Sequence, residues 1–242
     1  MSSARSDIDF DGSLPRREAT AARGAEAVAQ APAAFVRLLS ERREKPRAKE
    51  QEVLDVATAY FLKHGYQGAS INAMARSSGI SKESIYRYFS SKKQLFEAVI
   101  CRELAEYQAG VRRALSAEKT MDLREALINI AETVLEVATT DRTLALRRLI
   151  FDEARRSPDV GQHYYKIGPE YAFAAVEAIF RSHQSESEFD PAILSRHFLA
   201  LVAWRPILER ECALGPAPTR AQIRARVEPT VRDFMKAFLK SK

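Results

Sequence analysis

The stretch SINAMARSSGISKESIYRYFSSKKQ, residues 70–94, decides which fold this chain is predicted to adopt. It reads as two short helices on either side of a tight turn at Gly79, where glycine adopts a positive φ at little cost. Ser70 and Ser81 each stand just before residues of helical apolar spacing, which makes each of them an expected N-cap. The pattern predicts a helix-turn-helix over residues 70–89.

The second of these helices has an apolar stripe and a polar face. Ile85, Tyr88 and Phe89 follow the i, i+3, i+4 spacing of a side that packs inward. Outside that stripe are hydroxyl, phenol and charged side chains, at Lys82, Glu83, Ser84, Tyr86 and Arg87. Such groups suit contacts with phosphates and base edges, so the stretch is interpreted as a DNA-reading unit.

The charge of the chain permits nucleic-acid binding without requiring it. Its 242 residues carry a formal net charge of +6, with 46% hydrophobic and 29% charged residues, which is ordinary for a globular protein. The distribution is more informative, because residues 76–93 contain five cations and a single anion, Glu83. Positive charge concentrated around the predicted helix-turn-helix favours a DNA partner.

Several other classes of protein are disfavoured by the sequence. No apolar run approaches the ~20 residues that span a bilayer, and the N-terminus has no apolar signal region, so no membrane partner and a cytoplasmic location are expected. Cys101 and Cys212 form no zinc pattern, and the histidines lack metal-ligand spacing. Nucleophile motifs and glycine-rich phosphate loops are also missing. We therefore expect no catalytic residues, no metal and no cofactor.

Residues 1–46 are predicted to form an extension outside the main fold, because glycine, proline and small or charged residues interrupt them. Two interpretations remain open. The extension is a mobile tail, or its end is a basic arm that follows phosphates or enters a minor groove. The cations of such an arm are Arg37, Arg42, Arg43, Lys45, Arg47 and Lys49.

The rest of the chain shows helical spacing and no strand-like alternation, so the predicted fold is all-α. A helix over residues 47–64 ends at Gly65, and Ser91 with Gln94 forms a capping box that opens a long helix. Further helices are predicted at 122–139, from 141 to before Pro158, within 160–183 with a break at 168–169, at 190–214 with a kink near Pro206, and at 219–239.

Residues 52–99 resemble the DNA-binding domain of the TetR/AcrR family of bacterial transcriptional regulators. The resemblance rests on Gly65-Tyr66, the turn 79–82, the run 85–89 and Ser91-Lys92, which agree in order and spacing. The text LRRLIFDEARRSPDV (146–160) followed by YYKIGPE (164–170) resembles one branch of the family's C-terminal domains. The resemblance implies an N-terminal three-helix helix-turn-helix domain at 47–107 and a C-terminal helical ligand-binding and dimerisation domain at 108–242.

The resemblance also implies which side chains meet DNA. Two departures from the family pattern are Glu83, where a small residue is common, and Ser70, where threonine is common. Tyr86 and Lys92 are assigned to phosphates, whereas Lys82, Ser84 and Arg87 are the base-reading candidates. The residues predicted to face DNA are Ser70, Ser81, Lys82, Ser84, Tyr86, Arg87 and Lys92.

A ligand pocket in the second domain is expected to have aromatic walls, although each aromatic taken alone is more often part of an ordinary core. The candidates are Phe151, Tyr164, Tyr165, Tyr171, Phe173 and Trp204.

The function predicted from these features is a ligand-responsive, DNA-binding transcriptional regulator, with repression as the expected sign. It is expected to form a homodimer through its last two helices. This dimer is expected to bind a pseudo-palindromic operator and to be released from it by a small molecule. The alternatives are an all-helical small-molecule-binding protein or enzyme without DNA function, and a DNA-binding regulator without ligand response.

Overall fold

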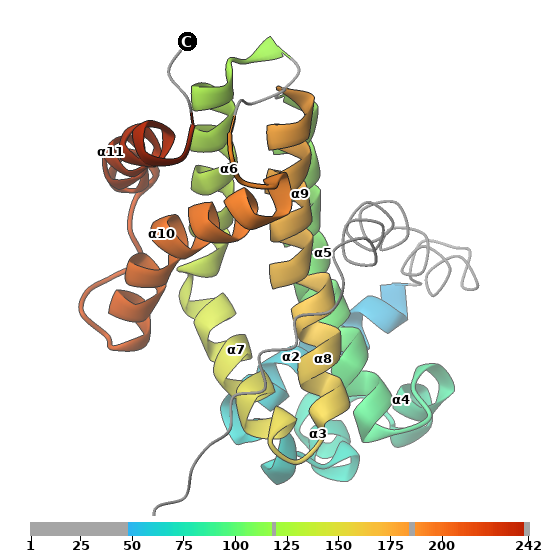
Figure 1. Ribbon diagram of the computed structural model, residues 1–242. Helices are drawn as coiled ribbons and strands as arrows, with labels where there is room; N and C mark the ends of the chain where they lie inside the picture. Colours follow the sequence, from blue (N-terminus) through green and yellow to red (C-terminus); the bar gives the residue numbers. More distant parts are fainter. Residues whose placement is uncertain (1–47, 118–119, 184–186, 240–242) are drawn as a thin grey trace, which may run out of the picture.

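The computed structural model describes residues 48–117, 120–183 and 187–239, and its regular structure over these ranges is α-helical, without strands (Figure 1). The all-α prediction is confirmed. The predicted extension at 1–46, and with it all of the basic arm except Lys49, lies outside the described residues.

The helix-turn-helix unit is built from three helices and the start of a fourth. These are α2 (Ala48–Gly68), α3 (Ile71–Ser78), α4 (Lys82–Tyr88) and α5 (Lys92–Ala117). The expected break at Gly65 is present, because this residue has φ 71° and ψ 167° inside α2. Its positive φ turns the last residues of α2 away from the helix axis and so fixes where α3 begins.

The second part of the described chain is a bundle of six helices and the C-terminal half of α5. Ser157, Gly168 and Asp190 each precede a helix that begins with proline, which suits the first helical position. The predicted break at 168–169 is confirmed, and α10 continues through Pro206. The helices are α6 (Leu123–Ala138), α7 (Asp141–Ala154), α8 (Pro158–Ile167), α9 (Pro169–Ser182), α10 (Pro191–Glu211) and α11 (Arg220–Phe238).

The capping arrangements at the starts of α5 and α11 differ. At Thr219 the box is complete, since its side chain caps the backbone of Gln222 and the Gln222 side chain returns to Thr219. At the start of α5 the Ser91 hydroxyl accepts from the Gln94 N–H at 3.1 Å, as predicted. The Gln94 side chain, however, accepts from the backbone N–H of Ser90 at 2.6 Å. That half of the prediction is wrong, because the glutamine reaches one residue further back.

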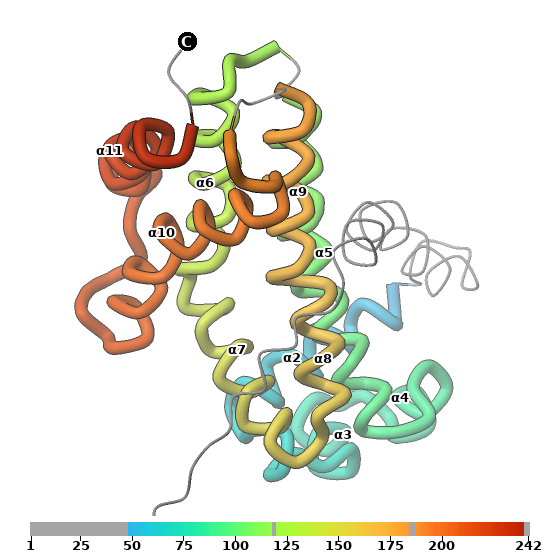
Figure 2. Tube along the Cα trace, viewed as in Figure 1, coloured from blue at the N-terminus to red at the C-terminus, as the bar shows by residue number. Residues whose placement is uncertain are grey.

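Helix α5 passes from the helix-turn-helix unit into the bundle, where α8 and α9 lie along it (Figures 1 and 2). The other end of the bundle is closed by aromatic packing of α9, α10 and α11. The rings of Phe198 and Phe234 lie 5.3 Å apart, and that of Phe180 is 5.9 Å from Phe234. No described helix is both long and apolar enough to cross a membrane.

Candidate functional site

The helix-turn-helix is held by a small apolar core. Ile71 and Met74 of α3 and Ile85 of α4 are buried, and so is Ile80 in the turn between them. Gly79 has φ 72° and its N–H donates to the Ala75 carbonyl, which closes α3 in the left-handed conformation that glycine favours. With both helices anchored on one side, the opposite side of α4 has a fixed orientation.

Three of the side chains predicted to face DNA are exposed together on α4. Lys82 and Arg87 are exposed, and the Tyr86 side chain is 45% exposed although it is a large aromatic. The Lys82 ammonium lies 5.7 Å from the centre of the Tyr86 ring, so the two form a joint cationic and aromatic surface. Glu83 is exposed on the same helix and remains the one anion there.

Two of the three predicted serines act as helix caps. Ser70 Oγ accepts from the Ala73 N–H at 3.1 Å, and Ser81 Oγ accepts from the Ser84 N–H at 3.1 Å. Ser81 Oγ also donates to Ser84 Oγ at 2.9 Å, which leaves the Ser84 proton for another acceptor. Capping uses the lone pairs of Ser70, so its proton likewise remains available to a phosphate.

Lys92 lies apart from the other candidates. Its ammonium donates to the carbonyls of Tyr66 and Ala69 at 3.0 and 3.1 Å and sits 4.4 Å from the centre of the Tyr66 ring. These contacts join the start of α5 to the connection between α2 and α3. An ammonium has three donors, so one remains for a phosphate, but Lys92 also has a structural role that the sequence did not indicate.

Lys92→Met is expected to lower the free energy of unfolding by about 1–2 kcal/mol, because two half-buried carbonyls lose their partner. Urea unfolding followed by circular dichroism measures this. The matched control is Lys93→Met, since Lys93 is exposed and pairs with Asp159 at the surface, where a pair contributes little. Equal stability of the two variants would contradict the structural role of Lys92.

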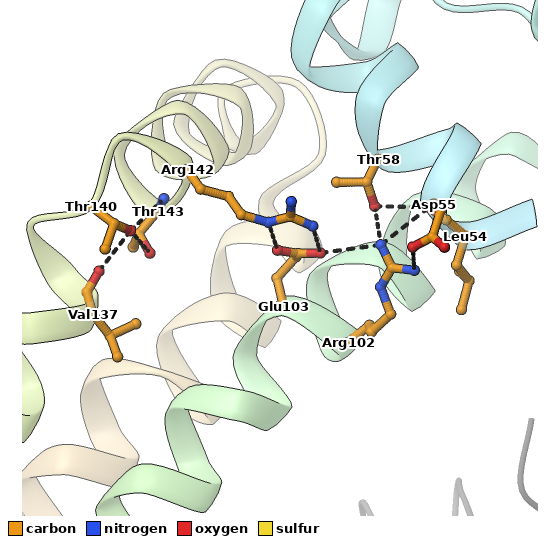
Figure 3. A network of polar contacts seen from close by, with 9 residues as sticks. All are labelled: Leu54, Asp55, Thr58, Arg102, Glu103, Val137, Thr140, Arg142 and Thr143. Carbon is orange, nitrogen blue, oxygen red and sulfur yellow. Dashed lines mark hydrogen bonds and ion pairs between the residues drawn. The ribbon is translucent and has the colours of Figure 1, made fainter. Parts of the chain in front are cut away.

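A polar network ties the helix-turn-helix unit to the bundle (Figure 3). From α5, Arg102 donates to Asp55 and Thr58 of α2, both at 2.7 Å. The next residue, Glu103, accepts from Arg102 at 3.2 Å and from Arg142 of α7 at 2.5 and 2.7 Å. Glu103 and Arg102 together thus connect three helices, α2, α5 and α7. We call Asp55, Thr58, Arg102, Glu103 and Arg142 the α2–α5–α7 network.

Glu103 is also the acid-sensitive group of this network. Burial alone would raise its pKa, but hydrogen bonds and charge from Arg142 and Arg102 outweigh burial and hold the pKa below its ordinary value. Because the folded-state pKa is depressed, the stabilisation from Glu103 is fully present above the unfolded value of about 4.3. It is lost as pH falls from there through the folded pKa.

Glu103→Gln is therefore expected to destabilise the protein at neutral pH but to lose stability less steeply than the wild type below about pH 4.3. Urea midpoints at pH 7, 5 and 3.5 measure the effect. Glu106→Gln is the control, because Glu106 is an exposed carboxylate on the same helix. Parallel pH profiles for the wild type and Glu103→Gln would contradict this assignment.

A cavity of about 290 Å³ lies between α5, α6, α7, α8, α9 and α10. Of the six aromatics predicted to line a ligand pocket, Tyr164, Phe173 and Trp204 do so. The other three do not: Tyr171 is buried elsewhere, and Phe151 and Tyr165 are about half exposed on the outside. The lining is otherwise apolar apart from Glu103, Tyr107, Thr143 and Arg147.

The polar residues of the cavity wall were not among the predicted ligand candidates. Tyr107 belongs to the apolar spacing of α5, and Arg147 stands in a run of charges, so neither has a signal of its own in the sequence. Glu103 is notable because it belongs both to the cavity wall and to the α2–α5–α7 network. Among the described residues, no cluster of histidine, cysteine or carboxylate side chains could hold a metal.

Comparison with known proteins supports both parts of this structure. Residues 53–99 match the family model described as bacterial regulatory proteins, tetR family, and residues 125–240 match that of the AefR-like transcriptional repressor C-terminal domain. The HTH-type transcriptional repressor Rv1474c of Mycobacterium tuberculosis is 29% identical over 188 residues, 76% of this chain and 94% of the relative.

Solved structures agree with these matches. A TetR-family transcriptional regulator from Mesorhizobium loti superposes with a TM-score of 0.71 at 23% identity, over 82% of this chain and all of the other, and supports the fold. A structure titled flavonoid-responsive regulator FrrA gives a TM-score of 0.65 at 27% identity, over 80% of this chain and 98% of the other.

An exposed recognition helix in a three-helix unit, followed by a helical bundle with a cavity, defines a helix-turn-helix transcriptional regulator with a ligand-responsive domain. With a family model matched in each domain, the chain belongs to the TetR family of bacterial transcriptional regulators.

Proposed function

We propose that this protein is a repressor that binds a pseudo-palindromic operator as a homodimer and is released by a small molecule. The observation that carries the proposal is the exposed face of α4, where Lys82, Tyr86 and Arg87 project from a helix anchored by Ile85. Exposing a large aromatic side chain such as Tyr86 to water is unfavourable, so its place beside two cations favours a binding surface over a merely solvated face. We assign this face to the major groove.

An apolar stripe on α10 supports the homodimer. Ile193, Leu201, Trp204 and Leu208 recur on one side of this helix, and all of them are exposed in the single chain. Trp204 is 69% exposed, which is costly for so large an apolar side chain in water. A second copy that packs its own α10 against this stripe would bury all four residues by two-fold symmetry. The outer face of α11 is more polar, so α10 is the principal candidate.

The α2–α5–α7 network supports release by a ligand. Glu103 borders the cavity and holds Arg102, and Arg102 holds α2. A molecule that displaces Glu103 or α7 therefore changes the position of the helix-turn-helix unit relative to the bundle. Two further contacts, from Gln67 to Glu153 and from Lys93 to Asp159, join the same unit to α7 and α8. A ligand that prefers one arrangement shifts the population toward it.

The proposal is tested by selecting bound sequences from random double-stranded DNA with the full-length protein. The expected result is an enriched inverted repeat whose half-sites lie about one helical turn apart, or a multiple of it. Enrichment of single half-sites would remove the dimer from the proposal, and no enrichment would overturn it. Transcription from a promoter carrying the selected site then distinguishes a repressor from an activator. Because its partner is operator DNA, the protein is proposed to act in the cytoplasm.

A further inference from the structure

The charged groups of the cavity wall are already neutralised by the protein. Glu103 accepts from Arg102 and Arg142. Arg147 donates to Glu211 at 3.3 Å and to the Ala138 carbonyl at 3.1 Å. Among the described residues that line the cavity, these are the only two with a charge. An ionised ligand would therefore lose its hydration without gaining an unpaired counter-charge, which costs free energy.

Tyr107 is the one buried polar side chain of the described cavity wall that makes no hydrogen bond. Its side chain is 7% exposed, and its hydroxyl makes no hydrogen bond to any described residue. No fully enclosed side-chain oxygen or nitrogen in the described residues lacks a partner, so the Tyr107 oxygen must border open space, and the cavity is the space it lines. Burial, then Tyr164 and Tyr171, raise the pKa of Tyr107 above its ordinary value. At neutral pH the group is a donor.

We propose that the effector is an uncharged aromatic ketone, with its rings between Tyr164, Phe173 and Trp204 and its carbonyl oxygen accepting from Tyr107. The proposal rests on the proposed function and adds the chemical class of the effector. Aromatic walls favour flat rings, and a buried donor without a partner favours a ligand that supplies an acceptor. A cavity of about 290 Å³ is at the small end of ligand pockets and suits a molecule of two rings.

Three diphenyl probes separate the contribution of the aromatic rings from those of the ketone and of a negative charge. Benzophenone carries the ketone, diphenylmethane lacks it, and 4-benzoylbenzoate adds a carboxylate. Binding to the full-length dimer is measured by calorimetry and by fluorescence of Trp204, the single tryptophan of the chain. We expect benzophenone to bind about three- to tenfold more tightly than diphenylmethane, as one hydrogen bond allows. The carboxylate should bind more weakly than either neutral probe.

Tyr107→Phe should remove the preference for the ketone and leave diphenylmethane binding unchanged. Tyr171→Phe is the matched control, because Tyr171 is equally buried but does not line the cavity. Ultraviolet irradiation of bound benzophenone, followed by mass spectrometry, should label residues of the cavity wall. The proposal is overturned if Tyr107→Phe keeps the preference, if the carboxylate binds most tightly, if labelling occurs elsewhere, or if no probe binds the wild type.

Failure here and failure of the proposed function are distinguishable. Operator binding by the unliganded protein does not depend on the effector and is measured by gel shift with the selected sequence. Release of that DNA by benzophenone, with Tyr107→Phe requiring about three- to tenfold more benzophenone, would link effector binding to the proposed function. DNA binding without any probe binding would overturn only the chemical class of the effector.

Discussion

Alanine at both Tyr86 and Arg87 is expected to lower operator affinity roughly 100-fold or more, while the protein stays folded and dimeric. Each protomer loses two contacts, and a good base contact alone discriminates by about 1–3 kcal/mol. Both side chains project from α4 into solvent, so their loss leaves no cavity in the core. Gel-shift titration against the selected operator measures the effect.

The loss should be greater on the operator than on unrelated DNA, because Arg87 is proposed to read a base rather than a phosphate. Arg112→Ala is the control for net charge, since it removes an exposed cation from α5 far from the recognition face. If Arg112→Ala weakens binding as much as the double variant does, α4 is not the reading helix.

Glutamate at both Leu201 and Leu208 is expected to convert the dimer to a monomer and to reduce operator affinity about 1,000-fold. Four carboxylates would meet across the two-fold axis, where the apolar stripe of α10 is proposed to pack. A monomer binds each half-site alone and loses the advantage of linked binding, which reaches about 10²- to 10⁴-fold. Sedimentation velocity gives the oligomeric state, and gel shift gives the affinity.

Both leucines are exposed in the protomer, so the monomer is expected to keep its helicity, while its thermal stability falls only by the stabilisation that dimerisation supplied. Tyr165→Glu is the matched control, because this aromatic is 54% exposed on α8, as Leu201 is on α10, and lies away from the stripe. A double variant that remains dimeric would rule out α10 as the interface. A monomer with full operator affinity would remove the need for a dimer.

The sequence predicted the helices well because their ends are encoded locally. Ser70, Gly79, Asp190 and Thr219 each determine a cap or a turn through their own side chain or φ, and Ser70 and Gly79 act as predicted. Gln94 shows the limit of this reasoning. The spacing of a capping box is also compatible with a bond to the preceding residue, and only the backbone geometry at Ser90 decides between them.

The sites were predicted less evenly, and the difference has a physical cause. Exposure of Lys82, Tyr86 and Arg87 follows from the period of one helix whose apolar side is evident. The cavity wall, in contrast, depends on how six helices are placed relative to one another. Tyr164 and Tyr165 are adjacent in sequence and equally aromatic, yet Tyr164 faces the cavity and Tyr165 faces outward. The partners of Lys92 likewise lie 23 and 26 residues away.

Helix α5 amplifies a small tilt at the cavity into a larger displacement of the helix-turn-helix unit. It is one unbroken rod of 26 residues, and Tyr107 lies fifteen residues, about 22 Å, from its first residue, Lys92. A tilt of about 5° near the cavity then displaces the start of the rod by about 2 Å. In a symmetric dimer the two displacements add, so the recognition helices would change their separation by up to about 4 Å against a fixed operator repeat of about 34 Å. A tilt of a few degrees at the cavity therefore becomes a misfit of up to about 4 Å on the DNA.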